Sequence, residues 1–247
     1  MMYDSVEINS IIIQQKLYYN GQLMLSYKIE YPQFASMKFQ SAVRRMNLRY
    51  KTKALEFQKH CQKKLFKMAV EQYEYSVENG FPFMGYEAIL NYTVTYNHDC
   101  TVSMYFQQYE YTGGAHGNTI QYSDSWNLQS AHRIMLWQLF TQAVNYRHYI
   151  ITQINLQIAQ QIANGENYYF ENYEENVANT FDEDSFYLTN KGVVIYFQQY
   201  DIAPYSSGIP RFTIPYYRGV VLRPRCRKFS AYPGGRNGLY PSGYSPF

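Results

Sequence analysis

Apolar and polar residues alternate over the first thirty positions of the chain. The alternation runs from Val6 to Tyr19 and resumes from Leu23 to Ile29. The Asn20-Gly21 pair between the two runs suits a tight turn, because both residues tolerate positive φ. The pattern therefore predicts a β-hairpin. Pro32 predicts the end of the second strand, since proline cannot donate a ladder hydrogen bond.

The apolar period then changes to steps of three and four residues, which is typical of one face of a helix. The pattern predicts one long helix between Ser36, a suitable N-cap, and the stop signal Asn79-Gly80-Phe81-Pro82. We expect one face of this helix to pack on a sheet and the other to carry positive charge into water. The apolar stripe consists of Phe39, Val43, Met46, Tyr50, Ala54, Phe57, Cys61, Leu65 and Met68.

Strand-like alternation returns after residue 85. Residues 88–96 and 102–108 alternate on either side of a turn at Asn97-His98-Asp99-Cys100. A glycine-rich loop at residues 113–117 leads to a further strand around Tyr122. An antiparallel meander of three or four strands is the simplest interpretation.

A second helical stripe runs from Leu136 to Ile162 and predicts a second long helix that ends at Asn164-Gly165. The acidic stretch beyond it is consistent with a short helix. Residues 186–188 and 193–197 then predict a last hairpin. Regularity fades after Pro215.

Together these elements predict an α+β fold in which an antiparallel sheet is packed by two long helices. We expect an N-terminal half with the hairpin and long helix over residues 1–85, and a C-terminal sheet half over residues 86–220. Residues 221–247 are basic and rich in Tyr, Gly and Pro, so we expect them to form a loosely ordered tail.

The formal net charge of +3 hides an uneven distribution. Residues 38–67 carry ten basic side chains against Glu56 alone, residues 211–236 are basic without an acid, and residues 166–184 are acidic. Such blocks are usually solvated surface; the alternative is an anionic partner. Nucleic acid is not expected, because a signal that consists of charge alone is non-specific.

Cysteine usage and hydropathy limit the remaining classes of protein. Cys61, Cys100 and Cys226 are odd in number and far apart, so the sequence indicates neither a disulfide framework nor a zinc site, and we expect buried or unreactive thiols. No run approaches the roughly twenty apolar residues of a membrane span. Residues 1–20 lack the basic-then-apolar order of a secretory signal. A cytoplasmic or spore-associated location is therefore expected, unless the chain is part of an exported protein.

No known catalytic motif appears in the sequence. Neither a GxSxG elbow, nor HExxH, nor GxxxxGK[ST] is present, and His60, His98, His132 and His148 lack ligand spacing. We therefore expect no catalytic residue, no metal site and no cofactor, so the chain is not expected to be an enzyme.

Two longer motifs carry a family resemblance. They are Tyr109-Glu110-Tyr111-Thr112-Gly113-Gly114-Ala115-His116-Gly117 and, after Phe186-Tyr187-Leu188-Thr189, the run Val194-Ile195-Tyr196-Phe197-Gln198-Gln199-Tyr200-Asp201-Ile202-Ala203-Pro204-Tyr205-Ser206-Ser207-Gly208. Over residues 6–216 the chain resembles a family of Gram-positive domains of unknown function, similar to the extracellular lysozyme-sensing region of the RsiV anti-sigma factor. Its N-terminal half resembles the module that precedes the catalytic domain of the PdaC deacetylase.

The resemblance implies a role in cell-envelope sensing or attachment, and not in catalysis. The sigma-binding segment of the sensor and the deacetylase domain have no counterpart in this sequence, so the resemblance implies neither signal transduction nor deacetylation. The chain is most similar to the short clostridial or bacillar members of the family.

The two motifs also provide the candidate ligand-binding residues. Glycines in the first loop let the backbone approach a neighbour closely and bring its histidine to a sheet rim; the alternative is a plain tight turn. The second loop offers a rigid proline and a tyrosine ring; the alternative is packing of that ring on its own sheet. We expect the two loops to converge at one rim of a shared sheet. The candidates are Tyr109, Tyr111, Gly113, Gly114, His116, Gly117, Asp201, Pro204, Tyr205 and Gly208.

The sequence thus favours a non-catalytic binding module for a cell-envelope component, either a peptidoglycan fragment or a lysozyme-like protein. The alternative is a structural or spore-associated protein whose Tyr, Gly and Pro-rich residues 232–247 mediate assembly.

Overall fold

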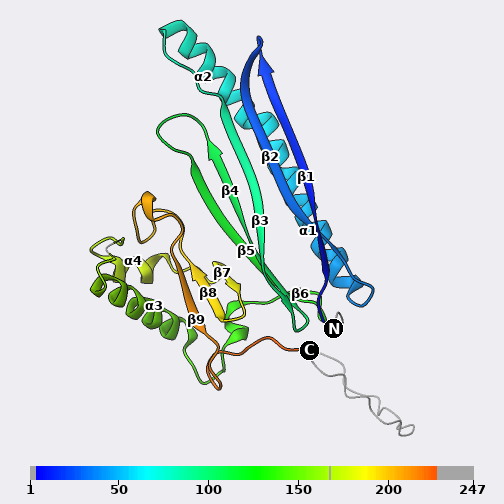
Figure 1. Cartoon of the computed structure of the whole chain (residues 1–247), viewed down its shortest axis with the longest axis vertical. Coiled ribbons are helices and arrows are strands. Elements are labelled where there is room, and N and C mark those ends of the chain that lie inside the picture. The colour runs from blue at the N-terminus through cyan, green and yellow to red at the C-terminus, as the bar shows by residue number, and fades with distance from the viewer. Residues whose placement is uncertain (1–3, 167, 227–247) are drawn as a thin grey trace, which may run out of the picture.

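The computed structural model describes residues 4–166 and 168–226, and Figure 1 shows two sheets with helices packed against them. A six-stranded sheet has the order β1-β2-β3-β4-β5-β6, and a three-stranded sheet has the order β7-β8-β9. In chain order the elements are β1 (Glu7–Tyr19), β2 (Gln22–Ala35), α1 (Gln40–His60), the π-helical segment η1 (Cys61–Leu65), α2 (Phe66–Asn79), β3 (Tyr86–His98), β4 (Thr101–Tyr111), β5 (Asn118–Asn127), β6 (His132–Arg133), the 3-10 helix η2 (Leu136–Leu139), α3 (Tyr146–Ala163), α4 (Tyr173–Thr180), β7 (Phe186–Leu188), β8 (Gly192–Tyr196), the 3-10 helix η3 (Tyr205–Ser207) and β9 (Arg211–Pro215).

The N-terminal hairpin is confirmed. β1 and β2 pair in antiparallel fashion, and the turn between them places Asn20 and Gly21 at positive φ. The expected end of the second strand at Pro32 is wrong, because β2 continues to Ala35. β2 is bonded to β3 only from Leu25 to Ile29. Beyond that point β2 has a single strand neighbour, and a strand with a free edge tolerates proline.

The long helix is confirmed as a continuous run of α1, η1 and α2. It begins at Gln40 with Phe39 as its N-cap, so the predicted N-cap Ser36 is wrong; the Ser36 hydroxyl accepts a hydrogen bond from the Phe39 amide at 3.2 Å before the helix starts. It ends where Gly80 takes the left-handed conformation with φ of 70°. This run connects β2 to β3, which are parallel, and a parallel pair needs such a crossover.

The antiparallel meander of β3, β4 and β5 is also confirmed, and the α+β class holds. The short strand β6 extends the meander. The pairing of β2 with β3 carries the six-stranded sheet across residue 85, so strands from both sides of that position form one sheet.

The second long helix is shorter than its apolar pattern indicated. α3 begins at Tyr146, where the side chain of Asn145 accepts a hydrogen bond from the His148 amide at 3.2 Å. The preceding apolar residues, which we expected to be helical, form η2 and an irregular segment whose Phe140 makes a bridge to Val221. Leu136 and Phe140 are buried all the same and Val144 is half-buried, so burial and not a helical period explains their spacing. β9 completes the second sheet and was not expected.

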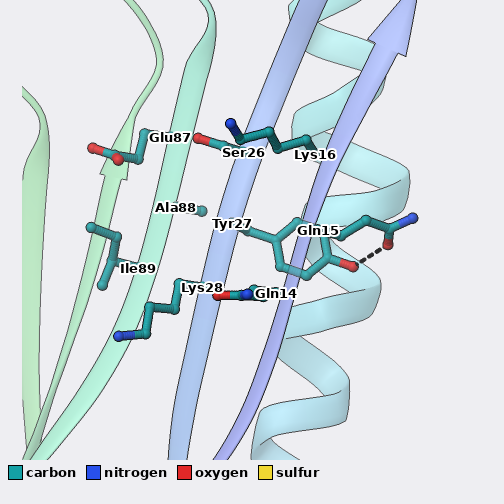
Figure 2. A pocket seen from close by; sticks show the side chains of 9 residues that line it. All are labelled: Gln14, Gln15, Lys16, Ser26, Tyr27, Lys28, Glu87, Ala88 and Ile89. Carbon is teal, nitrogen blue, oxygen red and sulfur yellow. Dashed lines mark hydrogen bonds between the residues drawn. The ribbon is translucent and has the colours of Figure 1, made fainter.

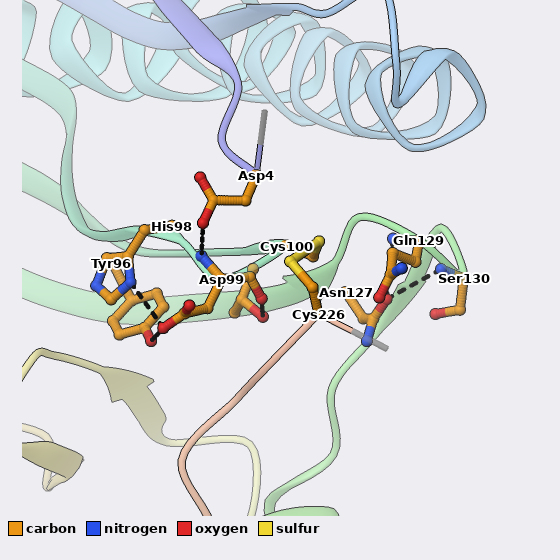
Figure 3. The surroundings of a disulfide bond; sticks show 10 residues. Asp4, Tyr96, His98, Asp99, Cys100, Asn127, Gln129, Ser130 and Cys226 are labelled. Carbon is orange, nitrogen blue, oxygen red and sulfur yellow. Dashed lines mark hydrogen bonds and ion pairs between the residues drawn. A yellow bond between two sulfur atoms is a disulfide. The ribbon is translucent and has the colours of Figure 1, made fainter. Parts of the chain in front are cut away.

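The expectation of three unpaired thiols is wrong, because Cys100 and Cys226 form a disulfide. Cys100 lies in the β3–β4 turn, and the segment after Leu222 returns to that turn (Figure 3). The two residues are 126 positions apart, so spacing alone gave no sign of the pair. Cys61 is free and buried, as expected, and burial raises the pKa of its thiol to about 12.

The two faces of the six-stranded sheet have different partners. Phe106 stacks on Tyr50 of α1, whereas its neighbour Tyr105 contacts Tyr187 of β7. Since successive strand residues point to opposite faces, α1 covers one face and the three-stranded sheet covers part of the other. Hydroxyl groups bridge the two sheets: the Ser103 hydroxyl, for example, accepts a hydrogen bond from the Leu188 amide at 2.8 Å.

A buried ionic cluster ties α1, β5 and β6 together. The Asp124 side chain is 1% exposed and lies 2.8 Å from Arg49 Nε and 2.7 Å from Arg133 Nε. Arg133 also reaches Asp184 at 3.2 Å, which links the first sheet to the segment before β7. The Asp124 carboxylate thus has two guanidinium partners, in keeping with the rule that a buried charge is paired.

The C-terminal part of the described chain is anchored up to the disulfide. The Leu222 amide donates a hydrogen bond to the Leu139 carbonyl at 2.7 Å. The tail expected over residues 221–247 lies outside the described residues from 227 onward. Within the part of the chain that the structure describes, no helix is long and apolar enough to cross a bilayer.

Candidate functional site

The two candidate loops meet in the structure. The ring of His116, in the β4–β5 loop, stacks on the ring of Tyr205, at the start of η3, with centroids 3.8 Å apart and planes 17° apart. Tyr205 also lies 6.0 Å from the ring of Tyr200. The loops come from different sheets, and not from the shared sheet that we expected: one follows β4 and the other follows β8.

The first loop owes its shape to the glycines and to Tyr111. Gly113 and Gly114 have φ of 94° and 88°, which side-chain-bearing residues rarely adopt. The Tyr111 hydroxyl donates a hydrogen bond to the Gly114 carbonyl at 3.0 Å. Gly117 serves close packing instead, because a Cβ there would lie 2.4 Å from the Tyr109 ring.

The second loop is held by its own polar groups. The Asp201 carboxylate accepts a hydrogen bond from the Gln198 amide at 2.7 Å, and burial raises the pKa of that carboxyl. Pro204 leads into η3, and Gly208 leaves it with φ of 67°. Asp201 therefore shapes the turn, while Tyr205 is the residue that reaches the first loop.

Two glutamines that the sequence analysis did not single out fix the second loop against β5. The Gln198 side chain accepts a hydrogen bond from the Gln121 amide at 3.0 Å and donates one to the Gln121 carbonyl at 2.7 Å. The Gln199 side chain accepts one from the Thr119 amide at 3.0 Å. The side chains of Gln198 and Gln199 thus form hydrogen bonds with the backbone at the edge of β5, as a neighbouring strand would. The sequence does contain one signal for these glutamines, namely their position inside the second motif, directly after β8.

A groove lies beside the two loops, on β1, β2 and β3 (Figure 2). Its volume is about 480 Å³, which is within the range of small-ligand sites. Both lysine side chains of the groove extend from the sheet in Figure 2, and Ala88 and Ile89 are the aliphatic residues of its lining. The lining residues are Gln14, Gln15, Lys16, Ser26, Tyr27, Lys28, Glu87, Ala88 and Ile89.

Strand register places the groove and the aromatic loops on one face. Lys28 pairs with Ile89 across β2 and β3, and Ile89 pairs with Tyr109 across β3 and β4. Directly opposed residues have neighbouring side chains on the same face. Burial raises the pKa of the Tyr109 phenol, and so do the charge of Glu87 and the phenol of Tyr205. A single surface, which we call the open face, therefore extends from the groove through Tyr109 to the His116–Tyr205 stack.

The titratable side chains of the described residues are dispersed. His60 lies 3.2 Å from Glu110 and His98 lies 3.0 Å from Asp99, each pair far from the other in the fold. Across residues 4–166 and 168–226 no group of three or more His, Cys, Asp and Glu could hold a metal ion. His116 Nδ1 donates to the Gly117 carbonyl at 3.1 Å, so its ring is committed to the loop and to Tyr205.

Two segments of the chain are similar to known protein families. Residues 20–119 match the sequence model of the family described as deacetylase PdaC, and residues 138–217 match that of DUF3298, a protein family of unknown function. A segment similar to the PdaC family is thus followed by a segment similar to DUF3298, which confirms the expected resemblance to the PdaC module. The similarity to RsiV stays a prediction.

Two solved structures support the fold. A DUF3298 family member from Bacteroides fragilis has a TM-score of 0.64 and 18% identity, and the match covers 86% of this chain and 92% of that one. A DUF3298 family protein from Pseudomonas aeruginosa has a TM-score of 0.58 and 18% identity, with 88% and 95% covered. No curated protein is found to match the chain. At this identity the likeness concerns the fold alone.

Proposed function

We propose that this chain is a non-catalytic module that binds a cell-envelope glycan, such as a peptidoglycan fragment, on its open face. The observation that carries the proposal is the stacking of His116 on Tyr205, because it joins the two motif loops into one aromatic rim beside a polar groove.

The chemistry of the open face suits a saccharide. Aromatic rings offer flat apolar surfaces to the C–H faces of a sugar, and they lose little conformational entropy on binding. Lys16, Lys28 and Glu87 in the groove can bond hydroxyl, amide and carboxylate groups. Strands lie about 4.8 Å apart, so the face from β1 to the β4–β5 loop extends about 15–20 Å, enough for a short oligosaccharide.

Two further facts favour an envelope ligand. Residues 20–119 match a family whose description names a deacetylase, and the sequence resemblance implies a role at the cell envelope. The Cys100–Cys226 disulfide is of a kind that persists in oxidising, extracytoplasmic compartments. The disulfide therefore favours export over the cytoplasmic location that the sequence first suggested.

The absence of catalysis is part of the proposal. Asp201 bonds its own loop, and His116 is occupied by Tyr205 and the Gly117 carbonyl. Neither side chain is paired with a nucleophile, which acid–base catalysis of acyl transfer would need. The structural or spore-associated alternative depends on residues 232–247, which lie outside the described residues.

The proposal is tested by calorimetric titration of the full chain with disaccharide-peptide fragments of peptidoglycan, with chitotetraose and, in a separate arm, with lysozyme. We expect micromolar to sub-millimolar affinity for a glycan. Tyr205→Ala should weaken it about tenfold, which corresponds to about 1.4 kcal/mol. Tyr75→Ala, at an exposed tyrosine of α2, is the matched control and should change nothing.

Each arm has a decisive result. Affinity no better than millimolar for both glycans would reject a glycan ligand. Tight binding of lysozyme alone, lost in Tyr205→Ala, would reassign the open face to a protein partner. Equal losses in Tyr205→Ala and Tyr75→Ala would place the binding surface elsewhere.

A further inference from the structure

The outward side of α1 combines basic and apolar residues in one line. A helix turns about 100° per residue, so Arg44, Leu48, Lys51, Leu55 and Lys59 fall within about 80° of arc. We call these five residues the basic ridge. All five are exposed, and Leu48 and Leu55 are 68% and 44% exposed. The buried residues of α1, on the opposite side, are Ala42, Met46, Tyr50, Ala54 and Phe57.

The two leucines are the unexpected part of the basic ridge. The outermost line of a surface helix is normally polar, because its inward stripe already supplies the packing. Here Leu48 and Leu55 are seven residues apart, so they lie one above the other on the line that is furthest from the sheet. Basic residues precede, separate and follow them. Contact with water explains why the charged side chains are exposed. It does not explain the two exposed leucines, because apolar side chains in water cost free energy.

The charge of the basic ridge continues along the helical run. Glu56 is the sole acidic residue between Lys38 and Lys67 in the sequence. Lys63 and Lys64 of η1 are exposed as well. The run from Gln40 to Asn79 is about 60 Å long at 1.5 Å per residue, so these groups lie along an extended helix (Figure 1).

We propose that the basic ridge docks on the surface of an anionic phospholipid bilayer. The helix lies parallel to the surface, Leu48 and Leu55 enter the interfacial layer, and the basic side chains contact lipid phosphates. A soluble polyanion would be bound by charge alone and would leave the leucines in water, so a bilayer fits the ridge better. Because α1 covers one face of the six-stranded sheet and the groove lies on the other, the open face then points away from the bilayer.

The test is co-sedimentation of the full chain with vesicles of equimolar phosphatidylglycerol and phosphatidylcholine, against vesicles of phosphatidylcholine alone. We expect binding to the anionic vesicles only. Lys51→Gln with Lys59→Gln should weaken it about 25-fold, since each charge contributes about fivefold. Leu48→Ser with Leu55→Ser should weaken it about tenfold.

The matched controls lie outside the basic ridge. Lys191→Gln with Arg218→Gln removes the same charge from exposed positions of the second half, and Leu156→Ser removes an exposed leucine of α3. Both controls should bind vesicles as the parent does. All of these positions are exposed, so near-ultraviolet circular dichroism should show an unchanged fold.

Three results would overturn the proposal. The first is no preference for anionic vesicles in the parent chain. The second is an equal loss in the control and ridge charge variants, because binding would then follow net charge alone. The third is unchanged vesicle binding in the double leucine variant together with displacement by polyphosphate, which would make the basic ridge a polyanion site.

Discussion

The disulfide allows a quantitative prediction about stability. The disulfide is best removed by Cys226→Ser in a Cys61→Ala background, because no other thiol then remains to form a disulfide with Cys100. The bond closes a loop of 126 residues. In the chain-entropy description, opening a loop of that size in the unfolded state costs about 5 kcal/mol of stability at 25 °C.

Part of this loss of stability is offset, because the folded state of the variant gains conformational entropy. Without the bond, residues 224–226 are released from the β3–β4 turn, and each freed residue regains about 1 kcal/mol of backbone entropy. Arg223 remains attached, since its guanidinium donates to the Asn190 carbonyl at 2.7 Å and lies over the Tyr216 ring. We therefore expect a net loss of about 2–4 kcal/mol in the free energy of unfolding.

Guanidinium denaturation followed by fluorescence measures this loss. The slope of the transition should rise in the Cys226→Ser variant, because the uncrosslinked chain exposes more surface when it unfolds. Adding Cys100→Ser should change little further, since one broken partner already opens the loop. A loss below about 1 kcal/mol, or a parent whose stability is unaffected by reductant, would refute the reasoning.

Three further predictions concern the interior. Asp124→Ala should lower the free energy of unfolding by about 3–5 kcal/mol, because it leaves two guanidinium groups without their buried partner, whereas Asp184→Ala, at a 64% exposed carboxylate, should cost less than about 1 kcal/mol. Gly117→Ala and Gly114→Ala should both lower the melting temperature, the first because a Cβ at Gly117 would lie 2.7 Å from the backbone carbonyl oxygen of Glu110, the second because Gly114 has a φ of 88° that alanine rarely adopts. The third follows from burial, which raises the pKa of the Tyr196 phenol to about 12. The folded chain keeps this proton while the unfolded chain loses it near pH 10, so its contribution is complete below pH 10 and is lost as the pH rises to about 12. The difference in absorbance between the parent and a Tyr196→Phe variant should show this phenol ionising near pH 12 in the folded chain and not near pH 10.

Local sequence determined most of the secondary structure. The alternation around Asn20-Gly21 and the stripe of the long helix reflect burial of one side of each element, and both were confirmed, the stripe as far as Leu65. The predicted stripe residue Met68 is wrong, because it is 37% exposed and Ala69 is buried in its place after the π-helical segment. The same reasoning failed at residues 136–144, because apolar spacing records burial and not backbone conformation. The candidate loop motifs could be read directly, although their role as ligand contacts remains a proposal.

Tertiary structure decided the rest, since those features join residues that are distant in the chain. The parallel pairing of β2 with β3, the disulfide and the stacking of His116 on Tyr205 each depend on how separate elements pack. The groove likewise exists only once three strands are in register. A local pattern specifies which side of an element is buried, but the choice of neighbour is made by the packing of the whole chain.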